Sequence, residues 1–114
     1  MAAQTLLVQR LRELLADEPV TREVSMFGGR SFMVNEKMVA SALKGANLLV
    51  RVPAERHEAL LEEPGAAQAE MGAGRDMGPG WIEVASASIS DDDALAFWID
   101  VALEHNRAVT GSDD

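Results

Sequence analysis

His57 and His105 are the only imidazoles in this 114-residue chain, and cysteine is absent. A metal site usually needs three or more converging ligands, and the lack of cysteine excludes thiolate ligands and thiol nucleophiles. We therefore predict neither a metal site nor a cofactor. His57 lies on the apolar face of a short predicted helix, which favours a packed, hydrogen-bonded ring. His105 lies near the end of another predicted helix, where the helix dipole favours a partly charged imidazole.

Two glycine-bearing segments raise the question of phosphate binding. Gly72-Ala73-Gly74, followed by Gly78, superficially resembles a dinucleotide-binding loop, but that fingerprint needs a preceding buried strand and a following helix, which the pattern here does not predict. Gly28-Gly29 is typical of a bend or bulge between strands. Arg30 and Arg75 lie next to these segments. The alternative that the two arginines form an anion-binding pocket therefore stays open.

The carboxylates do not form a pattern that indicates acid–base catalysis, and no serine lies in a GxSxG nucleophile elbow. Asp91-Asp92-Asp93 follows Ser90, which is typical of a capped helix start with acidic residues near the positive end of the dipole. We predict no catalytic residues.

The net charge of −9 bears on the class of partner. Affinity for nucleic acids depends on phosphate neutralisation by Lys and Arg, so this charge disfavours direct binding to DNA or RNA. The apolar runs span only a few residues, far fewer than the roughly 20 that cross a bilayer. The N-terminal residues carry no signal-peptide pattern. We expect a cytoplasmic protein that does not associate with membranes.

The elements that would position these residues follow from periodicity and turn signals. Apolar residues at helical spacing, Leu7, Leu11, Leu14 and Leu15, predict a helix from a Thr5 cap to about Asp17. Further helices are predicted over residues 54–63 and from Ser90 to about Arg107. Strands are predicted over 24–27, 31–35, 37–43, 47–52 and 81–85, with a possible short edge strand over 68–71.

Because most of the strands are consecutive, a parallel βαβ layout is disfavoured. We predict an α+β fold in the order α-β-β-β-β-α-β-β-α: one antiparallel sheet, a meander plus one or two further strands, with helices packed on one face. The length favours a single domain over residues 1–114, structured from about 5 to 109 with a frayed tail over 110–114.

Strand alternation predicts which side chains the sheet exposes. If Leu48, Val50, Ile82 and Val84 face the helices, the outer face carries Leu49, Arg51, Trp81 and Glu83. Trp and Arg are enriched at binding hot spots, so this outer set is a candidate interaction surface. The reverse register, with Trp81 in the core, stays open at this point.

Several short motifs resemble one family when taken in order. The motif residues that we single out are Met26, Phe27, Gly28, Gly29, Phe32 and Lys37. Later segments that fit are residues 48–52, the Gly80-Trp81 pair and the helix around Trp98. Together they resemble the N-terminal domain of the TfoX/Sxy family of bacterial competence regulators, over residues 6–109.

The resemblance implies an α+β domain that self-associates, which we expect to be a homodimer. Family members are thought to act as transcriptional co-regulators with the cAMP receptor protein, and full-length members carry a second, helical domain for which this sequence has no room. The hypothesis is a non-catalytic, regulatory protein-interaction domain. The alternative is a small domain that binds an anionic ligand, or an unrecognised enzyme.

Overall fold

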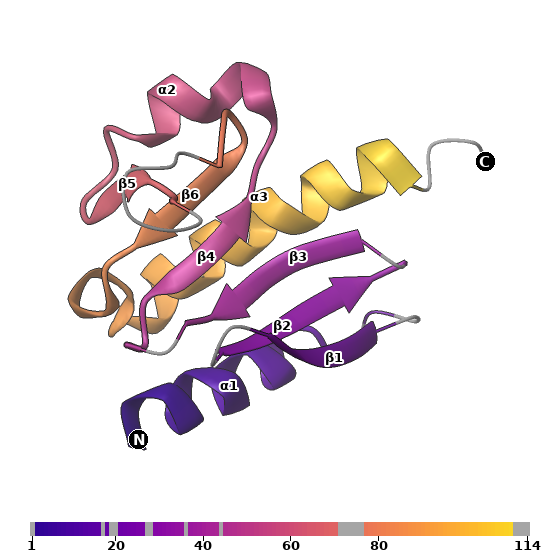
Figure 1. Cartoon of the computed structure of the whole chain (residues 1–114), viewed down its shortest axis with the longest axis vertical. Helices are drawn as coiled ribbons and strands as arrows, with labels where there is room; N and C mark the ends of the chain where they lie inside the picture. Colours follow the sequence, from indigo (N-terminus) through magenta and orange to yellow (C-terminus); the bar gives the residue numbers. More distant parts are fainter. Residues whose placement is uncertain are drawn as a thin grey trace.

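A computed structural model describes residues 2–16, 18, 21–26, 29–35, 37–43, 45–70 and 77–110. Within these residues the fold is α+β, with one six-stranded antiparallel sheet, which confirms the predicted class and element order (Figure 1). The elements are α1 (Ala2–Leu14), β1 (Thr21–Met26), β2 (Gly29–Val34), β3 (Lys37–Ala42), β4 (Leu48–Arg51), the 3-10 turn η1 (Ala54–Arg56), α2 (His57–Leu60), β5 (Ala66–Gln68), β6 (Trp81–Val84), the 3-10 turn η2 (Ser86–Ile89) and α3 (Asp92–Thr110).

The sheet combines a simple meander with one insertion. Strands β1 to β4 follow one another as neighbours, and the sheet order is β1-β2-β3-β4-β6-β5. After β4 the chain passes through η1 and α2 to the outer strand β5, and β6 then returns between β4 and β5. The pairing of β2 with β3 shifts register between Phe32 and Met33. A bulge of this kind bends the strand and changes which side chains share a face.

The apolar core lies between the sheet and the two long helices. α3 packs against β3 and β4, and it passes behind the sheet in the view of Figure 1. α1 lies next to the β1–β2 side of the sheet (Figure 1). Arg10 of α1 forms a 3.0 Å ion pair with Asp92 at the start of α3, and Arg107 of α3 forms a 3.3 Å ion pair with Glu18, which follows α1 in the chain.

The start of the first helix differs from its prediction. The helix begins at Ala2, so Thr5 lies inside it rather than at its cap. Alanine is a strong helix former, which accounts for the earlier start. Leu7, Leu11 and Leu15 are buried as predicted, but Leu14 is 38% exposed. The buried stripe is therefore narrower than the periodicity suggested.

The cap of the last helix also differs. The Ser90 hydroxyl donates a 3.2 Å hydrogen bond to the carbonyl oxygen of Ala87, so it closes the preceding 3-10 turn. α3 begins at Asp92, and the Leu95 amide donates to the Asp91 carbonyl. The acidic residues Asp92 and Asp93 lie in the first turn, where the helix dipole favours them.

Candidate functional site

Arg51 and Trp81 form the centre of the candidate interaction surface. They are directly opposite each other on β4 and β6, and the Arg51 Cζ lies 4.7 Å from the centroid of the Trp81 ring. Their inward neighbours Val50 and Ile82 are fully buried in the core. Alternation along the two strands therefore places Arg51 and Trp81 on the face opposite the helices. The pair is a cation–π contact between half-buried side chains.

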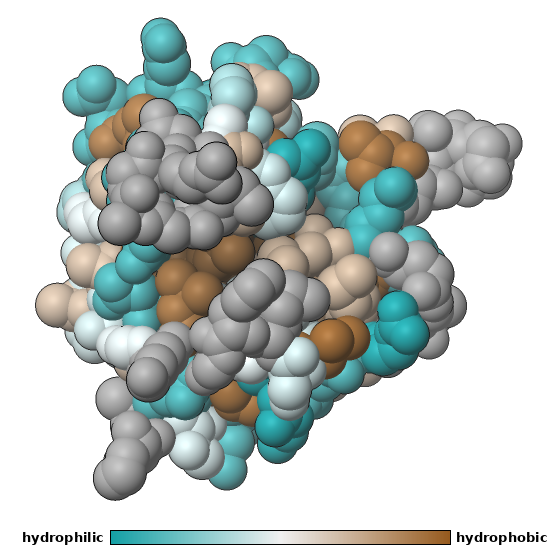
Figure 2. Space-filling view, viewed as in Figure 1, coloured by the Kyte–Doolittle hydropathy of each residue, from teal (hydrophilic) through white to brown (hydrophobic). Residues whose placement is uncertain are grey.

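Leu49 and Glu83 are the next cross-strand pair on the same face. Leu49 is buried, and Glu83 accepts a 2.8 Å hydrogen bond from Nδ2 of Asn47. The Asn47 Oδ1 accepts in turn from the amide of Ser86 at 3.0 Å. Thus the structure brings all four predicted residues together, but Leu49 and Glu83 are already engaged within the fold. Figure 2 shows hydrophobic residues in the hollowed middle of the face and hydrophilic ones around it.

A pocket of about 450 Å³ opens at the Arg51–Trp81 end of this face. Strands β3 and β4 pair only from Ala40↔Val50 to Ala42↔Leu48. Beyond the last pair, the first residues of β3 and the last turns of α3 contribute to the pocket wall. We call this site the basic pocket, and its lining residues are Lys37, Met38, Arg51, Trp81, His105, Asn106 and Val109.

His105 contributes an imidazole to the basic pocket. The pKa of His105 is lowered from its ordinary value of 6.5, chiefly by burial and then by the positive charge of Arg51, with Glu55 acting in the opposite direction. The expected partly charged imidazole at the helix end is therefore wrong. Burial disfavours the charged imidazole, and the positive charge of Arg51 disfavours it further.

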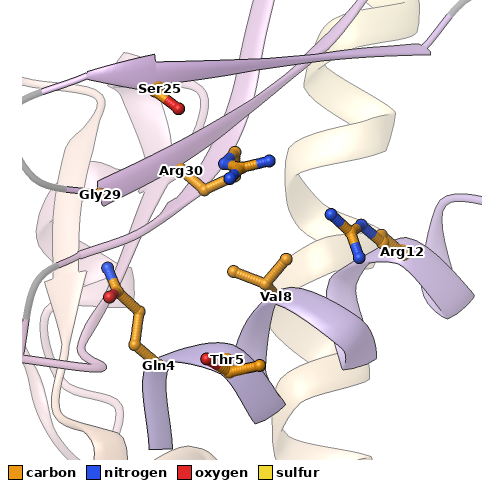
Figure 3. Close-up of a pocket in the computed structure, with 7 residues that line it drawn as sticks. All are labelled: Gln4, Thr5, Val8, Arg12, Ser25, Gly29 and Arg30. Carbon is orange, nitrogen blue, oxygen red and sulfur yellow. The ribbon is translucent and has the colours of Figure 1, made fainter. Parts of the chain in front are cut away.

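A second pocket, of about 400 Å³, lies between α1 and the β1–β2 hairpin. Arg12 reaches it from α1 and Arg30 from β2, with their guanidinium groups turned towards each other in Figure 3. Glu23 binds both: Arg12 Nε and Nη2 donate to it at 2.7 and 2.9 Å, and Arg30 Nη1 donates at 3.0 Å. Its pKa is lowered, first by the hydrogen bond from Arg12 and also by Arg30, although burial opposes them.

This arrangement bears on the predicted anion pocket. Arg30 is engaged with Glu23 and lies across from Arg12, a neighbour that sequence reasoning missed. Arg75 lies outside the described residues, and the predicted approach of Arg75 to Arg30 lies outside them with it. The Arg12–Arg30 pocket still holds two guanidinium groups for one carboxylate.

His57 is a packed and hydrogen-bonded ring, as predicted. It is 6% exposed, and its Nδ1 accepts a 2.9 Å hydrogen bond from the amide of Gly80. Its Nε2 lies 2.8 Å from Oε1 of Gln68. Because Nδ1 accepts, the proton resides on Nε2, which donates to the Gln68 oxygen. The ring therefore connects α2 to β5 and to the turn before β6.

The family-motif residues have structural explanations where the structure describes them. Met26 pairs with Gly29 across the first hairpin, while Phe27 and Gly28 lie outside the described residues. A Cβ on Gly29 would approach the carbonyl oxygen of Ala42 to 2.5 Å. Phe32 is buried in the core, and Lys37 begins β3 at the mouth of the basic pocket.

The Gly80-Trp81 pair combines a backbone requirement with a half-buried side chain. Gly80 has a φ of +96°, and a Cβ there would lie 3.0 Å from both the Arg51 guanidinium and the Val52 carbonyl oxygen. Positive φ strongly favours glycine. The glycine therefore lets the chain turn closely beside Arg51 and present the Trp81 ring to it.

Other kinds of site are not found in the described residues. No three or more His, Asp or Glu side chains there are grouped in a way that could hold a metal ion. None of the helices in this part of the chain has the length and apolar character to cross a bilayer.

Comparison with known proteins assigns the family. Comparison with curated proteins gives no match. The profile of the TfoX N-terminal domain matches residues 13–106. The match spans most of the sequence, including the first hairpin, the Arg51–Trp81 surface and nearly all of α3. The chain therefore belongs to the TfoX N-terminal domain family.

Proposed function

We propose that this domain is a non-catalytic interaction module in transcriptional regulation, which docks a protein partner through the sheet face around Arg51 and Trp81. The observation that carries the proposal is the Arg51 guanidinium over the Trp81 ring, at 4.7 Å. Arg and Trp are the side chains that most often dominate binding energy at protein interfaces. A pre-stacked pair also loses little side-chain entropy when a partner binds.

The family supplies the biological context of this proposal. TfoX proteins are competence regulators, so the partner that we propose is a transcription factor resembling the cAMP receptor protein. We further propose that the domain acts as a homodimer in the cytoplasm. Light scattering coupled to size-exclusion chromatography would measure the dimer directly, and a monomer at about 100 μM would contradict it.

The test of the docking surface uses purified components. The cAMP receptor protein from the same source is immobilised, and binding is compared for the wild type, the double variant Arg51→Ala with Trp81→Ala, and the control variant Arg10→Ala. Arg10 lies on α1 and pairs with Asp92 in the first turn of α3, at the end of α3 opposite to His105. We expect binding by the wild type and the control, and a loss of about tenfold or more in the double variant.

Circular dichroism must show that the double variant is folded. Undiminished binding by a folded double variant would contradict the proposal that Arg51 and Trp81 form the docking surface. No binding by any of the three proteins would count against this partner.

A second candidate function is the binding of a small anion at the Arg12–Arg30 pocket, because two guanidinium groups there share one carboxylate. A thermal-shift screen with nucleotides and phosphorylated metabolites tests it, since a ligand that binds only the native state raises the melting temperature. The absence of a shift with every anion would exclude this function. A shift that persists in Arg12→Gln would place the anion elsewhere.

A further inference from the structure

The basic pocket differs in charge from the protein as a whole. The chain carries a net charge of −9, yet the described lining of the pocket includes Lys37, Arg51 and His105 and no carboxylate. Among the described residues, neither Lys37 nor Arg51 is ion-paired with an acidic side chain. The Arg10, Arg12, Arg30, Arg56 and Arg107 side chains do have such partners. Unneutralised basic groups are therefore concentrated at this one pocket of the described surface.

The remaining walls of the pocket are apolar or held in place. Met38, Trp81 and Val109 supply apolar surface. Asn106 donates a 2.9 Å hydrogen bond from Nδ2 to the Val34 carbonyl oxygen, which fixes its side chain against β2. The site thus presents positive charge beside an aromatic ring. A volume of about 450 Å³ is enough for one or two side chains.

The Arg51 side chain is prepared for a carboxylate. The Arg51 guanidinium lies over the Trp81 ring, and its N–H donors lie in the plane of the guanidinium group. These donors match the two oxygens of a carboxylate in a bidentate hydrogen bond. The Trp81 ring limits the freedom of Arg51, so less entropy is lost when the carboxylate binds.

We propose that the basic pocket receives an acidic peptide segment of the partner protein, with a carboxylate on Arg51 and Lys37 and a neighbouring aromatic or aliphatic side chain against Trp81 and Met38. This inference rests on the proposed function and specifies the chemistry of the partner. Charge complementarity supports a peptide of this kind, because the basic side chains Lys37 and Arg51 in the described lining attract negative charge. The overall charge of −9 disfavours a nucleic acid as the occupant.

The experiment uses a defined peptide and the two tryptophans of the chain. The probe is acetyl-Leu-Asp-Glu-Phe-Asp-Leu-amide, and its control has Asn and Gln in place of Asp and Glu. Trp81 lines the pocket while Trp98 is buried on α3, so the two indole N–H signals separate pocket binding from a global change. Titration of the acidic peptide into ¹⁵N-labelled protein is expected to shift the NMR signals of Trp81, Lys37 and His105. The control peptide is expected to leave these signals in place.

Matched variants test the role of charge. Arg51→Gln is expected to weaken the binding of the acidic peptide about tenfold or more. Arg10→Gln removes the same charge elsewhere and is expected to leave the binding unchanged. Raising the salt from about 50 to about 500 mM should weaken binding strongly, because such contacts are screened. Equal binding by the amide peptide, undiminished binding by Arg51→Gln, or no shift at about 1 mM peptide would overturn the proposal.

Two further outcomes separate this inference from the proposed function. If benzoate alone shifts Trp81 and the peptide binds no more tightly than benzoate, the pocket takes a small carboxylate and the peptide proposal fails. If the acidic peptide does not bind but the Arg51/Trp81 double variant loses the purified partner, the proposed function stands while this partner chemistry fails.

Discussion

The amide of Gly80 donates a 2.9 Å hydrogen bond to Nδ1 of His57, so the turn before β6 is attached to the start of α2. The opposite ring nitrogen contacts Oε1 of Gln68 on β5 at 2.8 Å. Gln68 also donates through Nε2 to the carbonyl oxygens of Ala69 and Gly78, both at 3.1 Å. A single imidazole thus connects three segments that approach one another only in the folded state.

We expect His57→Ala to lower the free energy of unfolding by about 2–4 kcal/mol, because it leaves buried polar groups unpaired and opens a cavity. Urea denaturation followed by circular dichroism measures the loss. Glu58→Ala is the matched control, since Glu58 is an exposed neighbour on the same helix, and it should change stability by less than about 0.5 kcal/mol. Similar stabilities for the two variants would contradict the role of the ring.

Gly29→Ala is predicted to destabilise the first hairpin by about 1–3 kcal/mol, because the new Cβ would lie 2.5 Å from the Ala42 carbonyl oxygen. Gly45→Ala is the control. A Cβ at Gly45 meets no atom within 4 Å, and neither glycine has a positive φ. We expect Gly45→Ala to be neutral or slightly stabilising. Thermal melts of the two variants provide the comparison. Equal melting temperatures would contradict the steric argument.

The Arg12–Glu23–Arg30 cluster should make stability depend on pH in the acid range. The Glu23 pKa is lowered from 4.5 in the folded chain, mainly by the hydrogen bond from Arg12. The ionised carboxylate therefore contributes stability above the unfolded pKa, and this contribution is lost as the pH falls through the lowered folded value. Glu23→Gln should be less stable than the wild type at pH 7, and the difference should shrink in acid.

Urea midpoints between about pH 7 and pH 2 provide this comparison. Glu13→Gln removes an exposed carboxylate of α1 that has no ion pair among the described residues, and it should follow the wild type. A constant difference between Glu23→Gln and the wild type at every pH would show that the carboxylate charge is not responsible.

The charge of Arg51 should be measurable at His105. Burial lowers the pKa of His105 and Arg51 lowers it further, so Arg51→Gln is expected to raise that pKa. The His105 ring protons report the titration by NMR, and Arg10→Gln should leave the midpoint in place. An unchanged midpoint in Arg51→Gln would show that the two side chains do not interact in solution.

The titration of His105 should also make the free energy of unfolding depend on pH. Because the folded pKa of His105 lies below 6.5, the unfolded chain takes up a proton first as the pH falls. The folded state therefore loses stability as the pH drops through the unfolded value towards the folded one. In His105→Gln this loss should be absent, which urea midpoints between about pH 8 and pH 5 would detect.

The sequence predicted which side chains share a face of the sheet, because alternation is a local property of each strand, but it left open which face meets the helices. Leu48, Val50, Ile82 and Val84 alternate with Leu49, Arg51, Trp81 and Glu83, and all four of the first set are fully buried. Helix ends were less predictable, since Thr5 and Ser90 both resemble caps but have other positions or partners. Local patterns do not reveal which of several nearby backbone groups a hydroxyl will bind.

The basic pocket was not predictable from the sequence. Lys37, Arg51 and His105 come from three elements, and their approach depends on how α3 lies across β3 and β4. The register shift between Phe32 and Met33 also alters which residues share a face near Lys37. The lowered pKa of His105 has the same origin, because it depends on burial and on Arg51 rather than on the helix end.

The position of β6 has a consequence for synthesis and quality control. β4 is complete at Arg51, but the strand that covers its second edge begins only at Trp81, after α2 and β5. Until then, Leu48, Leu49 and Val50 lie on a strand with unpaired backbone groups on one side. Such edges pair readily with other chains. A chain truncated before Trp81 would therefore be prone to aggregate and to bind chaperones, whereas the longer chain closes that edge with its own residues.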